Sequence, residues 1–183
     1  MTRTQFCFAS ALVCSASALV CSASALAVMI ALPAPAQADD TATAALKSAD
    51  GKDVGTVMLT AVPTGVLLDV NVTNLPAGTH AFHIHETGLC EGPDFKSAGG
   101  HYNPEEDKHG LMNPAGPHAG DMPNIHVPAN GQLRIEVLNQ MVNLDSLLDE
   151  EGTAIVIHEG PDDYKSDPAG DAGPRLACGV IAK

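Results

Sequence analysis

The histidines of this sequence occur at spacings that suit metal binding. In the stretch HAFHIHETG, His83 and His85 are two residues apart and alternate with Phe82 and Ile84. Alternate side chains of a β-strand share a face, so the two imidazoles would point to one side and the two apolar side chains to the other. Neutral imidazole is a common ligand of zinc and copper. The pair alone fits two buried, hydrogen-bonded histidines equally well, so a metal site needs further ligands.

A second group of coordinating side chains lies in a segment without a regular pattern. Residues 87–124 are rich in Gly, Pro, Asp and His, and long irregular loops inside a compact domain are usually functional. This segment contains four candidate ligands: His101, His109, His118 and Asp121. Their spacings are too wide for one face of a helix, so the loop must fold around whatever they bind. Three nitrogens and one carboxylate oxygen form a closed tetrahedral set that suits zinc.

A further histidine ends an apolar run, TAIVIHEG. Ile155 and Ile157 take one face of this predicted strand, whereas Val156 and His158 take the other. His158 can therefore join the first histidine pair. Three imidazoles and one more from the loop favour Cu(II), which accepts a distorted planar set of nitrogens. The residues thus predict two metal sites.

Short, half-buried strands must position these ligands. Apolar and polar residues alternate over residues 66–73 and 133–137, and the turn sequences SADGKD, PTG, NLPAG and PANG separate such runs. This pattern predicts an all-β antiparallel sandwich or barrel. The segment NLDSLLDEEG predicts a turn or two of helix at most, and residues 159–175 form a second irregular segment.

The first 38 residues have the composition of an export signal. Arg3 precedes a long run of small and apolar residues that contains no acidic residue and ends in Ala36-Gln37-Ala38, a small-residue cleavage pattern. An uncleaved membrane anchor is the alternative, because the run is long enough to span a bilayer. Cleavage would leave a single domain, residues 39–183, in the periplasm or secreted, without stable membrane association.

The domain that remains is acidic and has two cysteines. An exported compartment favours a disulfide between Cys90 and Cys178, and two buried free thiols are the alternative. Eight of the nine basic residues and all 22 acidic residues lie after residue 38, which leaves a formal net charge of −14. This charge argues against binding to nucleic acid or to an anionic membrane.

Six motifs occur in an order and at spacings typical of one family: FHIHE, SAGGHYNP, KHG, PHAGD, IVIHE and GPRLACGVI. With them the sequence resembles the Cu,Zn superoxide dismutases, in their bacterial exported branch, over nearly all of residues 39–183. The resemblance implies an eight-stranded antiparallel Greek-key β-barrel, similar to an immunoglobulin sandwich, with two long functional loops. It also implies dismutation of superoxide to dioxygen and hydrogen peroxide by alternate reduction and reoxidation of copper, as a defence outside the cytoplasm.

The resemblance also implies a role for each site residue. The copper ligands would be His83, His85, His101 and His158, and the zinc ligands would be His101, His109, His118 and Asp121. His101 would bridge the two ions and act in catalysis. Asp162 matches the aspartate that links a copper histidine to a zinc histidine. Arg175 matches the arginine that pairs with superoxide, and Cys90–Cys178 matches the family's disulfide.

The sequence departs from the eukaryotic members near Arg175. Pro168 and Ala169 stand where those members have a lysine and a threonine that steer the substrate, which leaves Lys165 as the nearby positive charge. His80 and His126 match no ligand, and we expect both to be exposed.

Other questions stay open at the level of sequence. Monomer and homodimer are both compatible with the resemblance. A non-catalytic copper- and zinc-binding module of the same fold is the alternative function. A blue-copper carrier does not fit, because Cys178 has no His or Met close by in the sequence.

Overall fold

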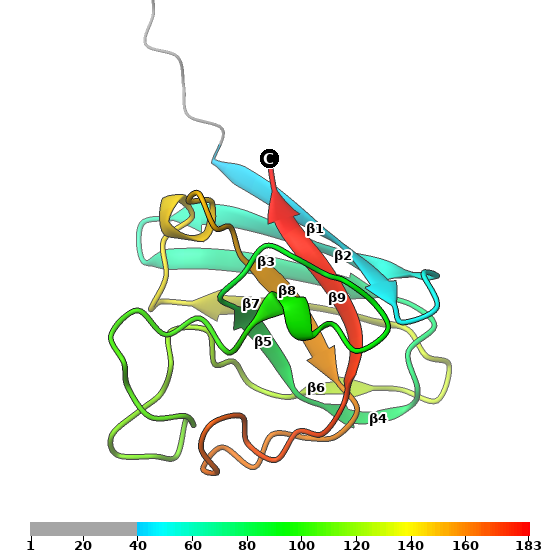
Figure 1. The fold of residues 1–183 in the computed structure, drawn as a ribbon. Coiled ribbons are helices and arrows are strands. Elements are labelled where there is room, and N and C mark those ends of the chain that lie inside the picture. The colour runs from blue at the N-terminus through cyan, green and yellow to red at the C-terminus, as the bar shows by residue number, and fades with distance from the viewer. Residues whose placement is uncertain (1–39) are drawn as a thin grey trace, which may run out of the picture. The chain divides into compact units, whose positions relative to one another are not determined.

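The computed structural model describes residues 40–183 (Figure 1), and the predicted export signal at residues 1–38 lies outside this range. The described residues form short strands and two 3-10 helices. Within them, no helix has the length and apolar character needed to cross a membrane. The elements are β1 (Thr41–Ser48), β2 (Asp53–Val62), β3 (Gly65–Val72), β4 (Gly78–His80), β5 (Phe82–His85), η1 (Lys96–Ala98), β6 (Ile125–Val127), β7 (Leu133–Asn139), η2 (Asp145–Leu147), β8 (Ala154–His158) and β9 (Arg175–Ala182).

All strand pairs are antiparallel. Seven strands form one curled sheet in the order β5-β8-β9-β1-β2-β3-β7, and β4 pairs with β6 (Figure 1). The strands form where apolar residues alternate with polar ones: in β3 the apolar side chains of Val66, Leu68, Val70 and Val72 are fully buried. The order places β9 beside β1 and β7 beside β3, so the chain crosses between distant strands. The predicted all-β antiparallel Greek-key class is confirmed.

His83 and His85 lie on a strand that changes its pairing partner along its length. β4 pairs with β6 and β5 pairs with β8, and only Ala81 separates β4 from β5. The backbone N–H of Ala81 donates to the carbonyl of Gly160, and its carbonyl accepts from the N–H of His158. The two segments are therefore one interrupted strand, and with this count the nine labelled strands agree with the eight that were predicted.

The core lies between the apolar faces of the sheet and consists mainly of Val, Leu, Ile and Ala, with Phe82 and Met122. Both faces of β8 are buried. Ile155 and Ile157 pack in the main core, while Val156 joins a smaller cluster with Phe95 and other residues under the first long loop. The predicted division of side chains along this strand is confirmed.

Two long irregular segments connect the strands beside the site. Residues 86–124 contain η1 as their one regular element, and residues 159–174 follow β8. The first loop covers the free edge of β5: the N–H of Ile84 donates to the carbonyl of Gly120 and its carbonyl accepts from the N–H of Tyr102. A side chain at Gly120 would meet the Ile84 carbonyl at 2.3 Å, so this close approach requires glycine. The loop is thereby fixed to the strand that carries the first histidine pair.

Candidate metal centre

The structure brings all seven predicted ligand residues together in two groups. β5 supplies two histidines, the end of β8 supplies one, and the first loop supplies the other four residues. Within each group the potential ligand atoms all lie within 4.8 Å of one another, and every residue is buried. The first group is His83, His85, His101 and His158, and the second is His101, His109, His118 and Asp121. His101 belongs to both.

The first group contains four ring nitrogens that lack a hydrogen-bond partner among residues 40–183. They are Nδ1 of His83 and Nε2 of His85, His101 and His158. The other nitrogen of each ring has a partner: in His85 it bonds to the carbonyl of Gly99 (3.0 Å) and in His158 to that of Gly173 (3.2 Å), whereas in His83 and His101 it bonds to a carboxylate. A buried polar atom without a partner is costly, and four that converge indicate a missing common partner. Four imidazole nitrogens form a set that suits copper.

The second group is centred on a single carboxylate oxygen. Oδ1 of Asp121 lies 2.7 Å from Nδ1 of His101, 3.1 Å from Nδ1 of His109 and 3.5 Å from Nδ1 of His118. Oδ2 of Asp121 accepts the backbone N–H groups of Gly110 and His118, which fixes the carboxylate. Three imidazole nitrogens and one carboxylate oxygen are a ligand set typical of zinc.

Asp162, from the second loop, connects the two groups. Its Oδ2 lies 2.7 Å from Nε2 of His83 and its Oδ1 lies 3.0 Å from Nε2 of His109. Each ring is therefore held through Nε2 and keeps Nδ1 for its own group. Gly170 makes room for this arrangement, because a side chain there would meet Oδ1 of Asp162 at 1.9 Å. Such outer carboxylates orient ligand rings and raise their basicity.

The histidines of the first group are held in the neutral form that binds metals. Burial lowers the pKa of His83 to about 4, although Asp162 opposes the shift. Burial also lowers the pKa of His158 to about 3 and holds that of His85 well below its ordinary value. Around pH 7 few protons therefore compete for these nitrogens.

In the second group burial also lowers the pKa of His118, but His109 and the carboxylates around it show the opposite balance. Burial works against a charged His109, but its bonds to Asp121 and Asp162 outweigh burial and raise its pKa to about 9. Burial alone would raise the pKa values of Asp121 and Asp162. Their hydrogen bonds to histidines outweigh burial and hold both pKa values well below the usual range. A cation is thus favoured where these side chains meet.

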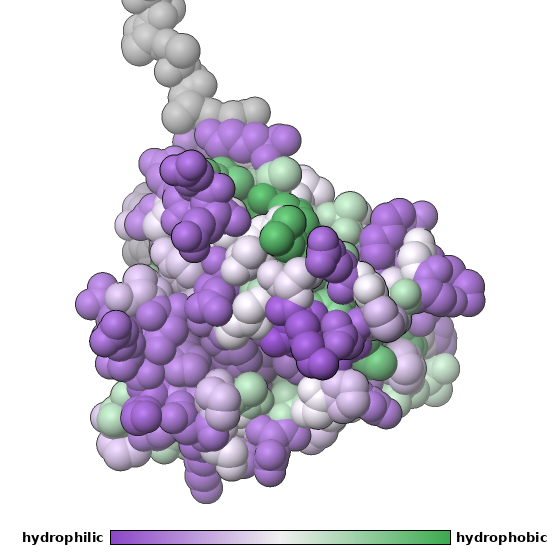
Figure 2. All heavy atoms as spheres, viewed as in Figure 1, coloured by the Kyte–Doolittle hydropathy of each residue, from purple (hydrophilic) through white to green (hydrophobic). Residues whose placement is uncertain are grey.

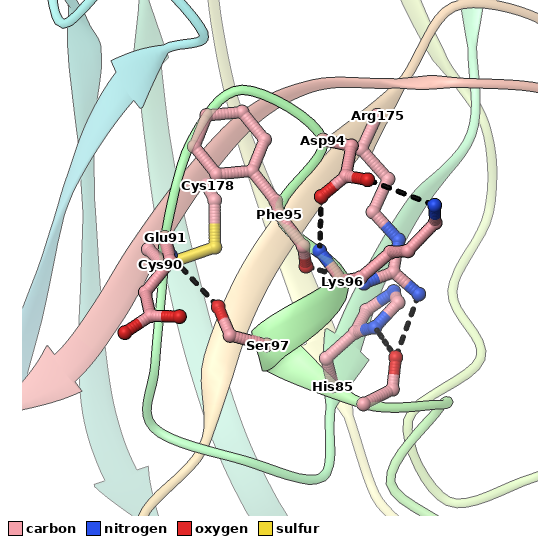
Figure 3. Close-up of a disulfide and its surroundings, with 10 residues drawn as sticks. His85, Cys90, Glu91, Asp94, Phe95, Lys96, Ser97, Arg175 and Cys178 are labelled. Carbon is pink, nitrogen blue, oxygen red and sulfur yellow. Dashed lines mark hydrogen bonds and ion pairs between the residues drawn. A yellow bond between two sulfur atoms is a disulfide. The ribbon is translucent and has the colours of Figure 1, made fainter.

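Arg175 lies beside the first group at the start of β9. Its guanidinium donates to the carbonyl of Phe95 (2.5 Å) and to that of Gly99 (2.6 Å) (Figure 3). The carbonyl of Gly99 also bonds to Nδ1 of His85, so one carbonyl positions both the arginine and a predicted copper ligand. Arg175 is half-buried and lines the hollow that leads to His101.

The predicted disulfide is present: Cys90 is bonded to Cys178 (Figure 3). Cys178 is buried in the small cluster with Phe95 and Ala98, and Cys90 packs against that cluster. The bond joins the first loop to β9 three residues after Arg175. It therefore fixes the part of the loop whose carbonyls hold the arginine.

A hollow of about 450 Å³ opens over both groups. Pro168 and Ala169 line it, as expected from the sequence. The expectation for Lys165 was wrong, because its exposed side chain is not part of the lining. Lys108, from the first loop, lines the hollow in its place. Nothing in the pattern around Lys108 could reveal this, because the position depends on how the two loops meet.

The expectation for the two remaining histidines was correct for His126, which is exposed, and wrong for His80, which is buried. Nδ1 of His80 lies 2.9 Å from the carbonyl of His158, and Nε2 lies 2.9 Å from that of Pro76. His80 thus fixes the backbone of a predicted copper ligand to the segment before β4. The local sequence pattern carries no signal for this burial, because it depends on the contact with the distant residue His158.

The fold and the site define a class: an all-β protein in which two strands and one long loop bring together two groups of potential metal ligands that share one histidine. Comparisons with known proteins agree. A sequence profile described as copper/zinc superoxide dismutase (SODC) matches residues 54–181. The chain belongs to this family.

Individual relatives include bacterial proteins named for the same activity. Superoxide dismutase [Cu-Zn] 1 of Aquifex aeolicus is 57% identical over 72% of this chain and 81% of its own length. Superoxide dismutase [Cu-Zn] of Caulobacter vibrioides is 47% identical over 77% of this chain and 85% of its own length. The solved Cu/Zn superoxide dismutase of Brucella abortus has a TM-score of 0.67 at 32% identity, and covers 77% of this chain and 99% of that one.

Proposed function

We propose that this protein catalyses the dismutation of superoxide, in which two superoxide anions and two protons give dioxygen and hydrogen peroxide. Its cofactors are copper and zinc. The observation that carries the proposal is a set of four convergent buried ring nitrogens without partners in residues 40–183, beside a second group of three histidines and Asp121 that shares His101 with the first. This donor chemistry fits copper in one group and zinc in the other.

The ligand assignment follows from the atoms that face each group. Copper would be held by Nδ1 of His83 and by Nε2 of three other rings, and zinc by three Nδ1 atoms and Oδ1 of Asp121. The structure supports this division, because the opposite nitrogen of most rings already has a partner. The copper ligands are His83, His85, His101 and His158, and the zinc ligands are His101, His109, His118 and Asp121.

Copper held by these residues would supply one-electron redox chemistry, taking an electron from one superoxide and giving an electron to the next. The side chains of this protein bind the anion and supply a proton. Arg175 presents its guanidinium beside the copper group, where it attracts an anion and fixes its orientation. His101 turns one ring nitrogen to each group, so its Nε2, whenever it is not bound to copper, would hold a proton and deliver it to the second superoxide, and the second proton would come from solvent.

We also propose that residues 1–38 direct export and are removed, so that residues 39–183 act in the periplasm or outside the cell. The Cys90–Cys178 disulfide supports this location, because such bonds persist in oxidising compartments. Determination of the first residue of the protein isolated from the exported fraction tests the proposal. A start at Asp39 is expected, and a chain that retains residues 1–38 would contradict cleavage.

The function is tested with purified residues 39–183. The second-order rate constant for superoxide is measured before copper removal, after its selective removal and after its return. We expect activity that disappears and returns with copper while zinc stays bound. Binding of both metals without dismutation would overturn the proposal and establish the alternative, a metal-binding module of the same fold.

A further inference from the structure

The mouth of the site contains charges of both signs. We define the mouth as the hollow over the two metal groups, and five charged side chains line it: Glu86, Asp107, Lys108, Asp167 and Arg175. Three are acidic and two are basic. The surface formed around the two long loops is mostly hydrophilic in the view of Figure 2. A superoxide anion must therefore pass acidic groups on a protein whose residues 39–183 carry a formal charge of −14.

The two cations lie at different depths. Arg175 is half-buried, and both of its terminal nitrogens donate to backbone carbonyls. The side chain of Lys108 is 61% exposed, and its Nζ lies 3.0 Å from Oδ2 of Asp167. Exposed ion pairs of this kind contribute at most about 1 kcal/mol, so the ammonium group is free to leave Asp167 for a passing anion. Lys108 is thus the outer cation of the mouth.

Asp167 keeps its place without Lys108. Its Oδ1 accepts the backbone N–H of His109 at 3.0 Å, which joins the second loop to the first. The backbone N–H of Lys108 itself donates to the carbonyl of Ala115 at 2.8 Å. Removal of the ammonium group alone therefore leaves the loop contacts intact and exposes a further uncompensated carboxylate at the mouth.

We infer that Lys108 is the residue that draws superoxide into the mouth, and that it hands the anion on to Arg175. The inference rests on the proposed dismutase function. Lys108 acts on capture of the substrate rather than on the electron transfer. Its contribution consists of a local positive field that offsets Asp107, Asp167 and Glu86, so it should disappear when salt screens the charges.

The test compares two variants with the same change in net charge. Lys108→Gln removes the outer cation, whereas Lys165→Gln removes an exposed cation of the second loop that does not line the mouth. At about 0.01 M ionic strength, where charges act over about 30 Å, we expect Lys108→Gln to lower the rate constant for superoxide about threefold. Lys165→Gln should change it much less, and Lys108→Arg should restore it.

A second readout does not depend on turnover. Azide, an anion, is titrated against the copper-loaded protein and its dissociation constant is measured from the copper absorption spectrum. Lys108→Gln should weaken azide binding at low salt, and the difference should vanish at about 1 M, where the screening length is about 3 Å. Copper and zinc contents and the melting temperature should stay at their original values, which separates guidance from a structural effect.

A substitution of opposite sign gives an independent check. Asp107→Asn removes an acidic group from the mouth, and Glu105→Gln removes one from the same loop outside it. The first should raise the rate constant at low salt by about twofold, and the second should leave it nearly unchanged. Equal effects of Lys108→Gln and Lys165→Gln, or an effect that persists at high salt, would overturn the inference. Absence of dismutase activity in the protein without substitutions would instead overturn the proposed function.

Discussion

Ring nitrogens divide their roles in the two metal groups. In His83, His85, His109 and His158 one nitrogen makes an orienting hydrogen bond and the other faces the group. His101 differs, because Nδ1 faces Asp121 and Nε2 is without a partner among residues 40–183. The arrangement leaves His101 as the one residue that both groups share, so substitutions at different histidines should affect the two metals differently.

Substitution of the shared ligand should affect both metals. We expect His101→Ala to lower copper and zinc contents together, whereas His85→Ala should lower copper content and leave zinc bound. Loss of an outer partner alone typically costs about 10- to 100-fold in affinity, so loss of a ligand should cost at least that. Elemental analysis of the purified variants checks this. Retention of zinc by His101→Ala would contradict the shared role.

Arg175 is not one of the proposed metal ligands, so its substitution should lower the activity without changing the metal contents. Arg175→Ala should lower the rate constant for superoxide by about tenfold or more, because an oriented positive charge beside the proposed copper ligands is lost. Metal contents should be unchanged. Arg134→Ala is the matched control, because Arg134 is exposed and pairs with Asp69 on β3. Full activity in Arg175→Ala would exclude the role in substrate binding.

At the scale of elements, the site depends on how loops are fixed to strands. The first loop covers the edge of β5 through Ile84, and Asp162 holds rings from β5 and from the first loop. The disulfide fixes the same loop to β9. Removal of one attachment should therefore loosen the loop without disturbing the sheet.

The disulfide gives the most direct test of these attachments. It joins residues 88 apart, and chain-entropy estimates for closing a loop of that length are about 4 to 5 kcal/mol. We expect the Cys90→Ser, Cys178→Ser double variant of the metal-free protein to unfold at a clearly lower temperature. Calorimetry of both proteins measures the change, and an unchanged melting temperature would contradict a stabilising role.

Elements were predictable where the pattern was local. The alternation of β3, the division of β8 between two faces and the extent of the two loops were all visible in the sequence. The break at Ala81, where a strand changes partners, was not, because it depends on hydrogen bonds to residues 158 and 160. The burial of His80 and the position of Lys108 at the mouth were missed for the same reason. Both follow from contacts between distant segments.

At the scale of the whole molecule, the buried histidines link stability to pH. In the metal-free fold the pKa of His83 is about 4 and that of His158 is about 3, below the value of about 6.5 for an unfolded chain. Between pH 6.5 and 4 the unfolded chain therefore binds more protons than the folded one, so stability falls as the pH falls. His109 opposes this trend only near and above pH 6.5, because its pKa of about 9 keeps it protonated in the fold while the unfolded chain is still taking up that proton; well below pH 6.5 both states hold it.

Denaturant unfolding of the metal-free protein at pH 7, 6, 5 and 4 measures this dependence. We expect the free energy of unfolding to decrease steadily across the series. His158→Gln removes one of the buried histidines with a lowered pKa and should flatten the decrease. A free energy that stayed constant, or increased, toward pH 4 would contradict the neutral state assigned to the buried rings.

The central claim is that two metal ions share His101. Anomalous X-ray diffraction from crystals of metal-loaded residues 39–183, recorded at the copper and zinc absorption edges, tests it most directly. We expect one copper peak and one zinc peak on opposite sides of the His101 ring, the copper about 2 Å from Nε2 and the zinc about 2 Å from Nδ1. A single peak, or a metal that does not contact His101, would contradict it.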